Sequence, residues 1–218
     1  MEREPDQGGW DYWTSVIQSC GNNAKCLQEQ RAKVSAAFFV EKEFQETGFF
    51  IFRLYKAALG RAPSYEEIKS DRPKLAGSRD LKAAKRTFVE SWVKRPQFTR
   101  LYASNLTTEQ FVEALLKNIQ ATSDVRLDDL RPRLIAEPGN DMGRTRIVQA
   151  LAEDETFARH EYERAIIFMQ YVAYLKREPD TKGLSFWTDV LAKQQSNNYY
   201  LMVKAFIDSK EYRSRFLR

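Results

Sequence analysis

Two stretches of this 218-residue chain resemble each other, and the resemblance limits the folds that the chain can adopt. Residues 54–63 read LYKAALGRAP and residues 170–179 read QYVAYLKREP, so each position has a counterpart 116 residues further on. In both stretches a helical pattern with an aromatic residue ends at Leu-x-Arg-x-Pro, because proline cannot continue a helix. The chain is therefore predicted to contain related helical units.

A second signature closes each unit. FVESW at 88–92 is followed by Phe98, and MVKAF at 202–206 is followed by Tyr212. A degraded middle copy opens with FVEALL at 111–116 and closes with IVQAL at 147–151 and Phe157. These matches predict three imperfect repeats of about 55 residues, near 47–102, 107–162 and 163–218. Units of this size cannot bury their apolar faces alone, so we expect them to pack as one body.

Apolar residues recur at helical spacing along most of the chain, and alternating strand patterns are almost absent. Residues 24–59 fit two helices that meet at a bend near Gly48, and Ser64 with Glu67 forms a capping signature. Further helices are expected near 79–94, 107–120, 126–136, 143–153, 157–176, 184–193 and 199–208, and from about 210. The turn residues between them fall at 96–97, 137–140, 178–180 and 196–198.

The predicted fold class is all-α, a compact multi-helix bundle of about ten short helices built from the three repeats. We expect one helical domain over residues 23–218, preceded by an N-terminal aromatic segment over residues 1–22.

The composition excludes most metal chemistry. His160 is the one histidine, and Cys20 and Cys26 are the two cysteines, too few for a His-ligated zinc, a two-His haem or a four-Cys site. We therefore expect no metal and no cofactor. No Gly-x-Ser-x-Gly elbow and no phosphate loop occur, so no catalytic residue and no enzyme activity are predicted. A pair of carboxylates that meet only in three dimensions is the remaining alternative.

Positive charge is concentrated in one stretch. Residues 69–100 carry ten basic and three acidic residues, whereas the rest of the chain has no basic excess. Arg79, Lys82, Lys85 and Arg86 recur at spacings that place much of this charge on one side of a helix. Such a side is either a solvated helix face or a surface for an acidic partner. No nucleic-acid motif accompanies it, so no nucleic-acid partner is predicted.

The cysteines bear on the compartment. Cys20 and Cys26 flank a turn signal at residues 21–23, where a local disulfide is favoured over two free thiols. A disulfide predicts a secreted or cell-surface protein. No apolar run is long enough to span a bilayer, and the first residues show no signal-peptide pattern, as in a domain cut from a longer protein. Asn105 begins a glycosylation triplet that a helix cap explains equally well.

Residues 54–63, 171–187 and 202–212 resemble a bacterial family of helical domains catalogued as domain of unknown function 4214. Residues 20–39 look like the long soil-bacterial variants of this family. More remotely, the Arg-x-Pro unit is similar to phycobilisome linker domains, which hold other proteins together. The resemblance implies a secreted or surface-layer module, and no catalytic residue carries over. The chain departs from the family at 62–64, where the acidic residue after proline is missing, and in the middle copy, which lacks Arg-x-Pro.

The motif residues are predicted to be structural: Arg61, Pro63, Arg177, Pro179, Asp180, Gly183, Trp187 and Tyr212. Arg61 and Arg177 follow helix ends and are expected to form ion pairs or to bind helix carbonyls. Asp180 is favoured as a helix N-cap over a calcium ligand. Asp154 is expected to cap the helix before Phe157, as Ser209 does before Tyr212.

Two tryptophans near the N-terminus, Trp10 and Trp13, could stack on sugar rings or plug the end of the core, and plugging is favoured. From these residues we expect a non-catalytic, extracytoplasmic module for protein–protein interaction or assembly, with other proteins or copies of itself as partners. The alternative is a cell-envelope domain that binds a polysaccharide or another acidic polymer through Trp10, Trp13 and the basic helix.

Overall fold

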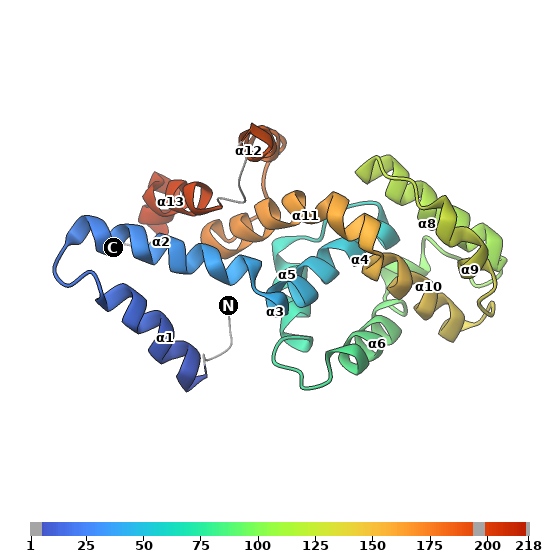
Figure 1. Cartoon of the computed structure of the whole chain (residues 1–218). Helices are drawn as coiled ribbons and strands as arrows, with labels where there is room; N and C mark the ends of the chain where they lie inside the picture. Colours follow the sequence, from blue (N-terminus) through green and yellow to red (C-terminus); the bar gives the residue numbers. More distant parts are fainter. Residues whose placement is uncertain (1–5, 194–198, 217–218) are drawn as a thin grey trace. The chain divides into compact units, whose positions relative to one another are not determined.

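Helices account for all regular structure in the computed structural model of this chain, which describes residues 6–193 and 199–216 (Figure 1). Within these residues there is no strand, so the predicted all-α class is confirmed. The predicted turn at 196–198 lies outside the described residues.

The chain divides into two compact units. The first comprises Met1–Gln45 and Ile166–Arg218, and the second comprises Glu46–Ala165. The boundaries fall close to residues 47 and 163, the starts of the first and third predicted repeats. The single domain and its three repeats nevertheless stay predictions.

The second unit holds the middle of the chain. Its elements are a π-helical turn η1 (Gln45–Phe49), α4 (Phe50–Leu59), α5 (Tyr65–Asp71), the 3-10 turn η2 (Arg72–Lys74), α6 (Leu81–Trp92), α7 (Pro96–Thr99), α8 (Thr108–Ser123), the 3-10 turn η3 (Asp128–Leu130), α9 (Arg131–Ile135), α10 (Asp141–Glu153) and most of α11 (Glu155–Gln170).

Helix α4 forms the centre of this unit. Eight of its ten residues are buried, as expected for a helix that is apolar on nearly all sides. It packs against α8 and α10, and α10 packs in turn against α6. The largest side chains in this core, with no exposed surface, include Phe50, Tyr55, Trp92 and Phe111.

A charged group is buried in this core. The ammonium of Lys56 on α4 lies 2.7 Å from Glu161 Oε2 on α11 and donates to the Thr122 carbonyl at 3.0 Å. Arg164 donates to the other oxygen of Glu161 at 3.0 Å. Burial lowers the pKa of Lys56, and the charge of Glu161 opposes this effect. A buried charge is tolerated only when it is paired and hydrogen-bonded in this way.

The first unit joins the two ends of the chain. Its elements are α1 (Gln7–Gln18), α2 (Ala24–Val40), α3 (Lys42–Phe44), the π-helical turn η4 (Tyr171–Leu175), α12 (Thr181–Lys193), α13 (Tyr200–Asp208) and α14 (Lys210–Phe216). Helix α2 packs against α13 on one side and α1 on another, and α14 lies against η4 and α13 (Figure 1).

One sequence prediction about the N-terminal part needs correction. The break within 24–59 falls at Glu41, whose extended ψ of 138° ends α2, whereas Gly48 lies inside the π-helical turn η1. The aromatic segment over 1–22 is helical from Gln7, because Asp6 caps α1 by accepting from the Gly9 amide at 2.8 Å.

Candidate functional site

Three helical segments end in the same backbone conformation. α4, α8 and η4 are each followed by a residue with left-handed φ: Gly60 at 64°, Asp124 at 53° and Lys176 at 52°. Asp124 and Lys176 are the only non-glycine residues of the described chain with positive φ. A left-handed residue is a common way to end a helix, and here it ends the opening helix of each predicted repeat.

Arg61 stabilises the turn after α4 by hydrogen bonds and a contact with an aromatic ring. Its Nη1 donates to the Ala62 carbonyl at 2.9 Å, and its two terminal nitrogens each lie 2.7 Å from one carboxylate oxygen of Glu67. The guanidinium carbon also lies 5.5 Å from the centre of the Tyr55 ring. This bidentate geometry requires the planar fork of arginine.

Arg177 makes similar contacts after η4, but its carboxylate partner comes from the closing segment. Nη1 donates to the Glu178 carbonyl at 3.0 Å, Nε and Nη2 reach the two oxygens of Glu211 at 2.8 and 3.0 Å, and the guanidinium lies 5.1 Å from the Tyr171 ring. The pKa of Glu211 is lowered, chiefly by the hydrogen bond from Arg177. Both arginines thus make the ion pairs expected for a structural role.

Asp180 is the N-cap of α12. Its Oδ1 accepts from the Gly183 amide at 2.9 Å, and this bond lowers the pKa of Asp180. Ser64, at the equivalent position in the first predicted repeat, accepts from the Glu67 amide at 3.1 Å within a complete capping box. The predicted cap is confirmed. Among the described residues no group of three or more acidic, His or Cys side chains is arranged to hold a metal.

Gly183 leaves room for Tyr171. A Cβ at position 183 would overlap the buried Tyr171 hydroxyl, whose ring is held by Arg177. We expect Gly183→Ala to lower the free energy of unfolding by about 1–3 kcal/mol, the usual cost of overpacking. Urea denaturation measures this. In a Tyr171→Phe background the same change should cost less, and an equal cost in both backgrounds would contradict the proposed overlap.

The closing segments pack edge-to-face on the opening ones. Trp92 lies 5.1 Å from Tyr55 with the ring planes at 74°, and Phe206 lies 4.8 Å from Tyr171 at 78°. The two pairs occupy equivalent positions in the first and third predicted repeats, and this agreement supports the repeat. The remaining motif residues also pack inward: Pro63 is buried, and Pro179, Trp187 and Tyr212 are half-buried.

Three of the four residues of the predicted basic face are exposed, and one is buried. Lys82 and Arg86 on α6 are exposed, and Arg79 is exposed just before the helix begins. Lys85 is buried: its ammonium lies 3.4 Å from Glu153 and 5.0 Å from the centre of the Phe50 ring. Lys85 therefore belongs to the packed side of α6, which the spacing of the charges did not reveal.

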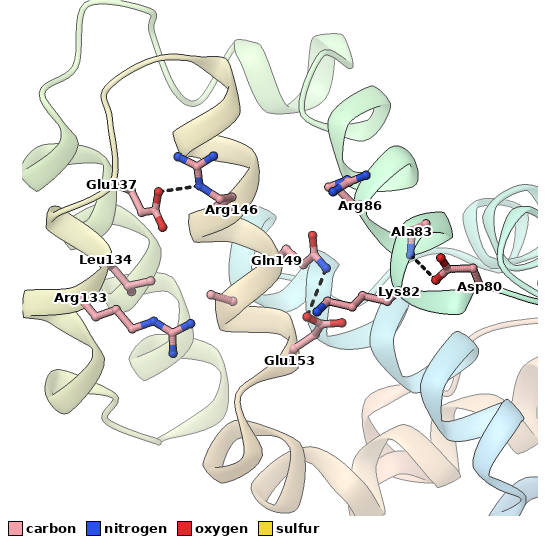
Figure 2. Close-up of a pocket in the computed structure, with 11 residues that line it drawn as sticks. Asp80, Lys82, Ala83, Arg86, Arg133, Leu134, Glu137, Arg146, Gln149 and Glu153 are labelled. Atoms are coloured by element: carbon pink, nitrogen blue, oxygen red, sulfur yellow. Dashed lines mark hydrogen bonds and ion pairs between the residues drawn. The ribbon is translucent and has the colours of Figure 1, made fainter.

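Lys82 and Arg86 border a hollow of about 430 Å³ in the second unit (Figure 2). The hollow lies among α6, α9 and α10, and α9 and α10 contribute two further arginines, Arg133 and Arg146. Its apolar lining comes from Ala83, Leu134 and Ala150. Sequence reasoning missed Arg133 and Arg146, because they lie more than thirty residues beyond the basic stretch and belong to no motif.

The acids of this hollow already have partners. Glu137 lies 2.6 Å from Arg146 Nε, and Glu153 accepts from the Gln149 amide at 3.2 Å in addition to its ion pair with Lys85. Asp80 caps α6 by accepting from the Ala83 amide at 2.9 Å. These acids are therefore not a free pair that could act as acid and base.

Trp10 and Trp13 both lie on α1 but in different surroundings. Trp13 is half-buried, with its ring 5.5 Å from Phe38 of α2, so it packs between the two helices. Trp10 is 58% exposed. Both belong to the first unit, whereas the basic residues belong to the second.

Exposed apolar side chains are concentrated in the first unit. Six of the eight large ones in the described chain belong to it: Trp10, Tyr12, Val40, Phe186, Leu201 and Phe216. Helix α1 buries no residue completely, and α12 buries only Leu191. The first unit therefore leaves two amphipathic helices with apolar surface in contact with water.

The two cysteines are paired. Cys20 in the turn after α1 and Cys26 in the first turn of α2 lie at disulfide distance, with their Cα atoms 5.5 Å apart. This contact is compatible with an extracytoplasmic location. Thr107, the last residue of the glycosylation triplet, caps α8 in a complete capping box, and Asn105 is exposed. No helix of the described residues combines the length and apolarity needed to cross a bilayer.

These observations define a class of all-helical module in which arginine and aromatic residues stabilise the turns after the helices. Residues 148–216 match the sequence model of the family named Domain of unknown function (DUF4214). The resemblance predicted from the sequence is thereby confirmed over these residues. Comparison with curated proteins and with solved structures gave no significant match.

Proposed function

We propose that this protein is a non-catalytic, extracytoplasmic interaction and assembly module, and that its first unit binds other proteins, including copies of itself. The observation that carries the proposal is the exposed apolar surface of α1 and α12. Trp10 and Tyr12 on α1 and Phe186 on α12 are each more than half exposed, and protein interfaces bury such side chains as anchors. Tryptophan and other aromatic residues are also enriched in the centres of interfaces.

The carboxylates support a non-catalytic role. An enzyme that uses a general acid at neutral pH raises the pKa of a carboxyl group. Among the residues that the structure describes, hydrogen bonds and ion pairs that stabilise the charged form lower the pKa of each carboxyl group with a resolved shift: Glu67, Asp71, Asp180, Asp208 and Glu211. The cysteine pair supports a location outside the cytoplasm, where disulfides persist.

Self-association is tested by sedimentation velocity over a range of protein concentrations. The wild-type mass should rise with concentration, and Phe186→Glu should weaken the association at least tenfold, because a charge replaces an exposed aromatic anchor. Met142→Glu is the matched control, since Met142 is 63% exposed but lies on α10 of the second unit. A wild-type chain that stays monomeric, or equal effects of both variants, would contradict the proposal.

The alternative, binding of an envelope polysaccharide or another acidic polymer, is favoured by one observation, the hollow beside Lys82 and Arg86. The aromatic part of that hypothesis is weaker, because Trp13 packs against Phe38 and only Trp10 is exposed.

A further inference from the structure

We propose that the hollow among α6, α9 and α10 binds an acidic oligosaccharide that carries uronate carboxylates. The site goes beyond the interaction surface of the first unit and does not depend on it. Its volume of about 430 Å³ lies within the usual range of ligand pockets, about 300–1,000 Å³.

The first argument is the available positive charge. Lys82 and Arg133 form no ion pair within the described residues, and the nearest acid to Arg86 is Glu90, 3.9 Å away. All three cations are exposed and border the same hollow. Figure 2 shows Lys82 and Arg86 on one side of α10 and Arg133 on the other. An extended ligand with several carboxylates can therefore reach both sides.

The second argument selects the chemical class. Glu137, Glu153 and Asp80 line the same hollow, and a carboxylate only accepts hydrogen bonds. A phosphate polymer has no hydroxyl group that could donate a hydrogen bond to these acids, so its negative charges would only be repelled by them. A uronate sugar offers carboxylates that can pair with the cations. Its hydroxyl groups can donate hydrogen bonds to the acids and to the side-chain carbonyl of Gln149. The mixed lining therefore favours an acidic sugar over a polyphosphate.

The third argument is the apolar lining. Leu134 is buried at the base of α9, and Ala83 and Ala150 face the hollow from α6 and α10. The C–H face of a sugar ring can pack on such a surface while its hydroxyl and carboxylate groups reach the polar rim.

The test is isothermal titration of the full-length protein with an oligogalacturonate hexamer. Wild-type protein should bind the hexamer, and its methyl ester, in which the carboxylates are uncharged, should bind at least tenfold more weakly. Lys82→Glu and Arg133→Glu should each weaken binding about tenfold or more, since both remove a cation that contacts the carboxylates. Both residues are exposed, and circular dichroism confirms that the variants fold.

Arg79→Glu is the matched control. Arg79 belongs to the same basic stretch and is exposed, but it does not line the hollow. Binding should change less than twofold in this variant. An equal loss in Arg79→Glu would indicate non-specific attraction to the basic stretch and overturn the site. Absence of wild-type binding, or tighter binding of an inorganic polyphosphate of equal charge, would also overturn it.

Discussion

Replacement of Glu161 by alanine is expected to lower the free energy of unfolding by about 3–5 kcal/mol, the cost of leaving one partner of a buried ion pair uncompensated. Glu161 has no exposed surface, and Lys56 would keep only the Thr122 carbonyl as a polar partner. Glu163→Ala is the matched control, because Glu163 is an exposed residue of the same helix. Guanidinium denaturation monitored by circular dichroism measures both variants.

The pH dependence of Glu161→Ala identifies the cause of its instability. Without Glu161 nothing opposes the lowering of the Lys56 pKa by burial, so the folded variant releases this proton at a lower pH than the unfolded chain. The unfolded state then binds more protons, and stability rises with pH between the folded pKa and the unfolded value of about 10.4. The double variant Lys56→Met/Glu161→Leu should regain most of the loss, since an apolar pair can replace a buried ion pair. A double variant as unstable as the single one would refute this account.

Replacement of Asp71 by asparagine is expected to cost about 3 kcal/mol at neutral pH, at the lower end of the range for a broken buried pair. Asp71 is 1% exposed; its two oxygens lie 2.6 and 2.7 Å from the guanidinium of Arg95, and it accepts from the Tyr55 hydroxyl at 2.8 Å. Arg95 keeps some contact with water, with 26% of its side chain exposed, and this contact limits the cost. Asp129→Asn, an exposed acid of the same unit, should leave stability unchanged.

The stability that the ionised Asp71 side chain contributes should be lost in acid. Burial alone would raise the pKa of Asp71, but the hydrogen bonds from Arg95, Lys74 and Tyr55 outweigh it and lower the pKa. A lowered folded pKa means that the contribution is fully present above the unfolded pKa of about 3.9 and is lost as the pH falls through the folded value. The difference between wild type and Asp71→Asn should therefore be constant above about pH 5 and shrink below about pH 4. A difference that does not depend on pH would assign the effect to packing.

The features that could be predicted from the sequence are those that depend on the spacing of nearby residues. The helix ends at Gly60 and Lys176, the capping box at Ser64 and the N-cap at Asp180 all follow from residues within a few positions of one another. Such contacts form between residues that are close in the sequence and do not depend on the tertiary fold, which is why they could be predicted.

The sequence could not predict contacts that join distant segments. Lys85 has the spacing of an exposed helix charge, yet Glu153 and Phe50 draw it into the packed side of α6. Arg133 reaches the hollow only because α9 and α6 border the same part of α10.

The covalent loop between α1 and α2 has a consequence for exchange of segments between molecules. Helix α1 buries no residue completely, so little apolar burial opposes its transfer to the same groove on a second chain. With Cys20 and Cys26 joined, the hinge between the helices is closed over six residues and cannot straighten as such domain swapping requires. The bond therefore favours packing of α1 on α2 of its own chain.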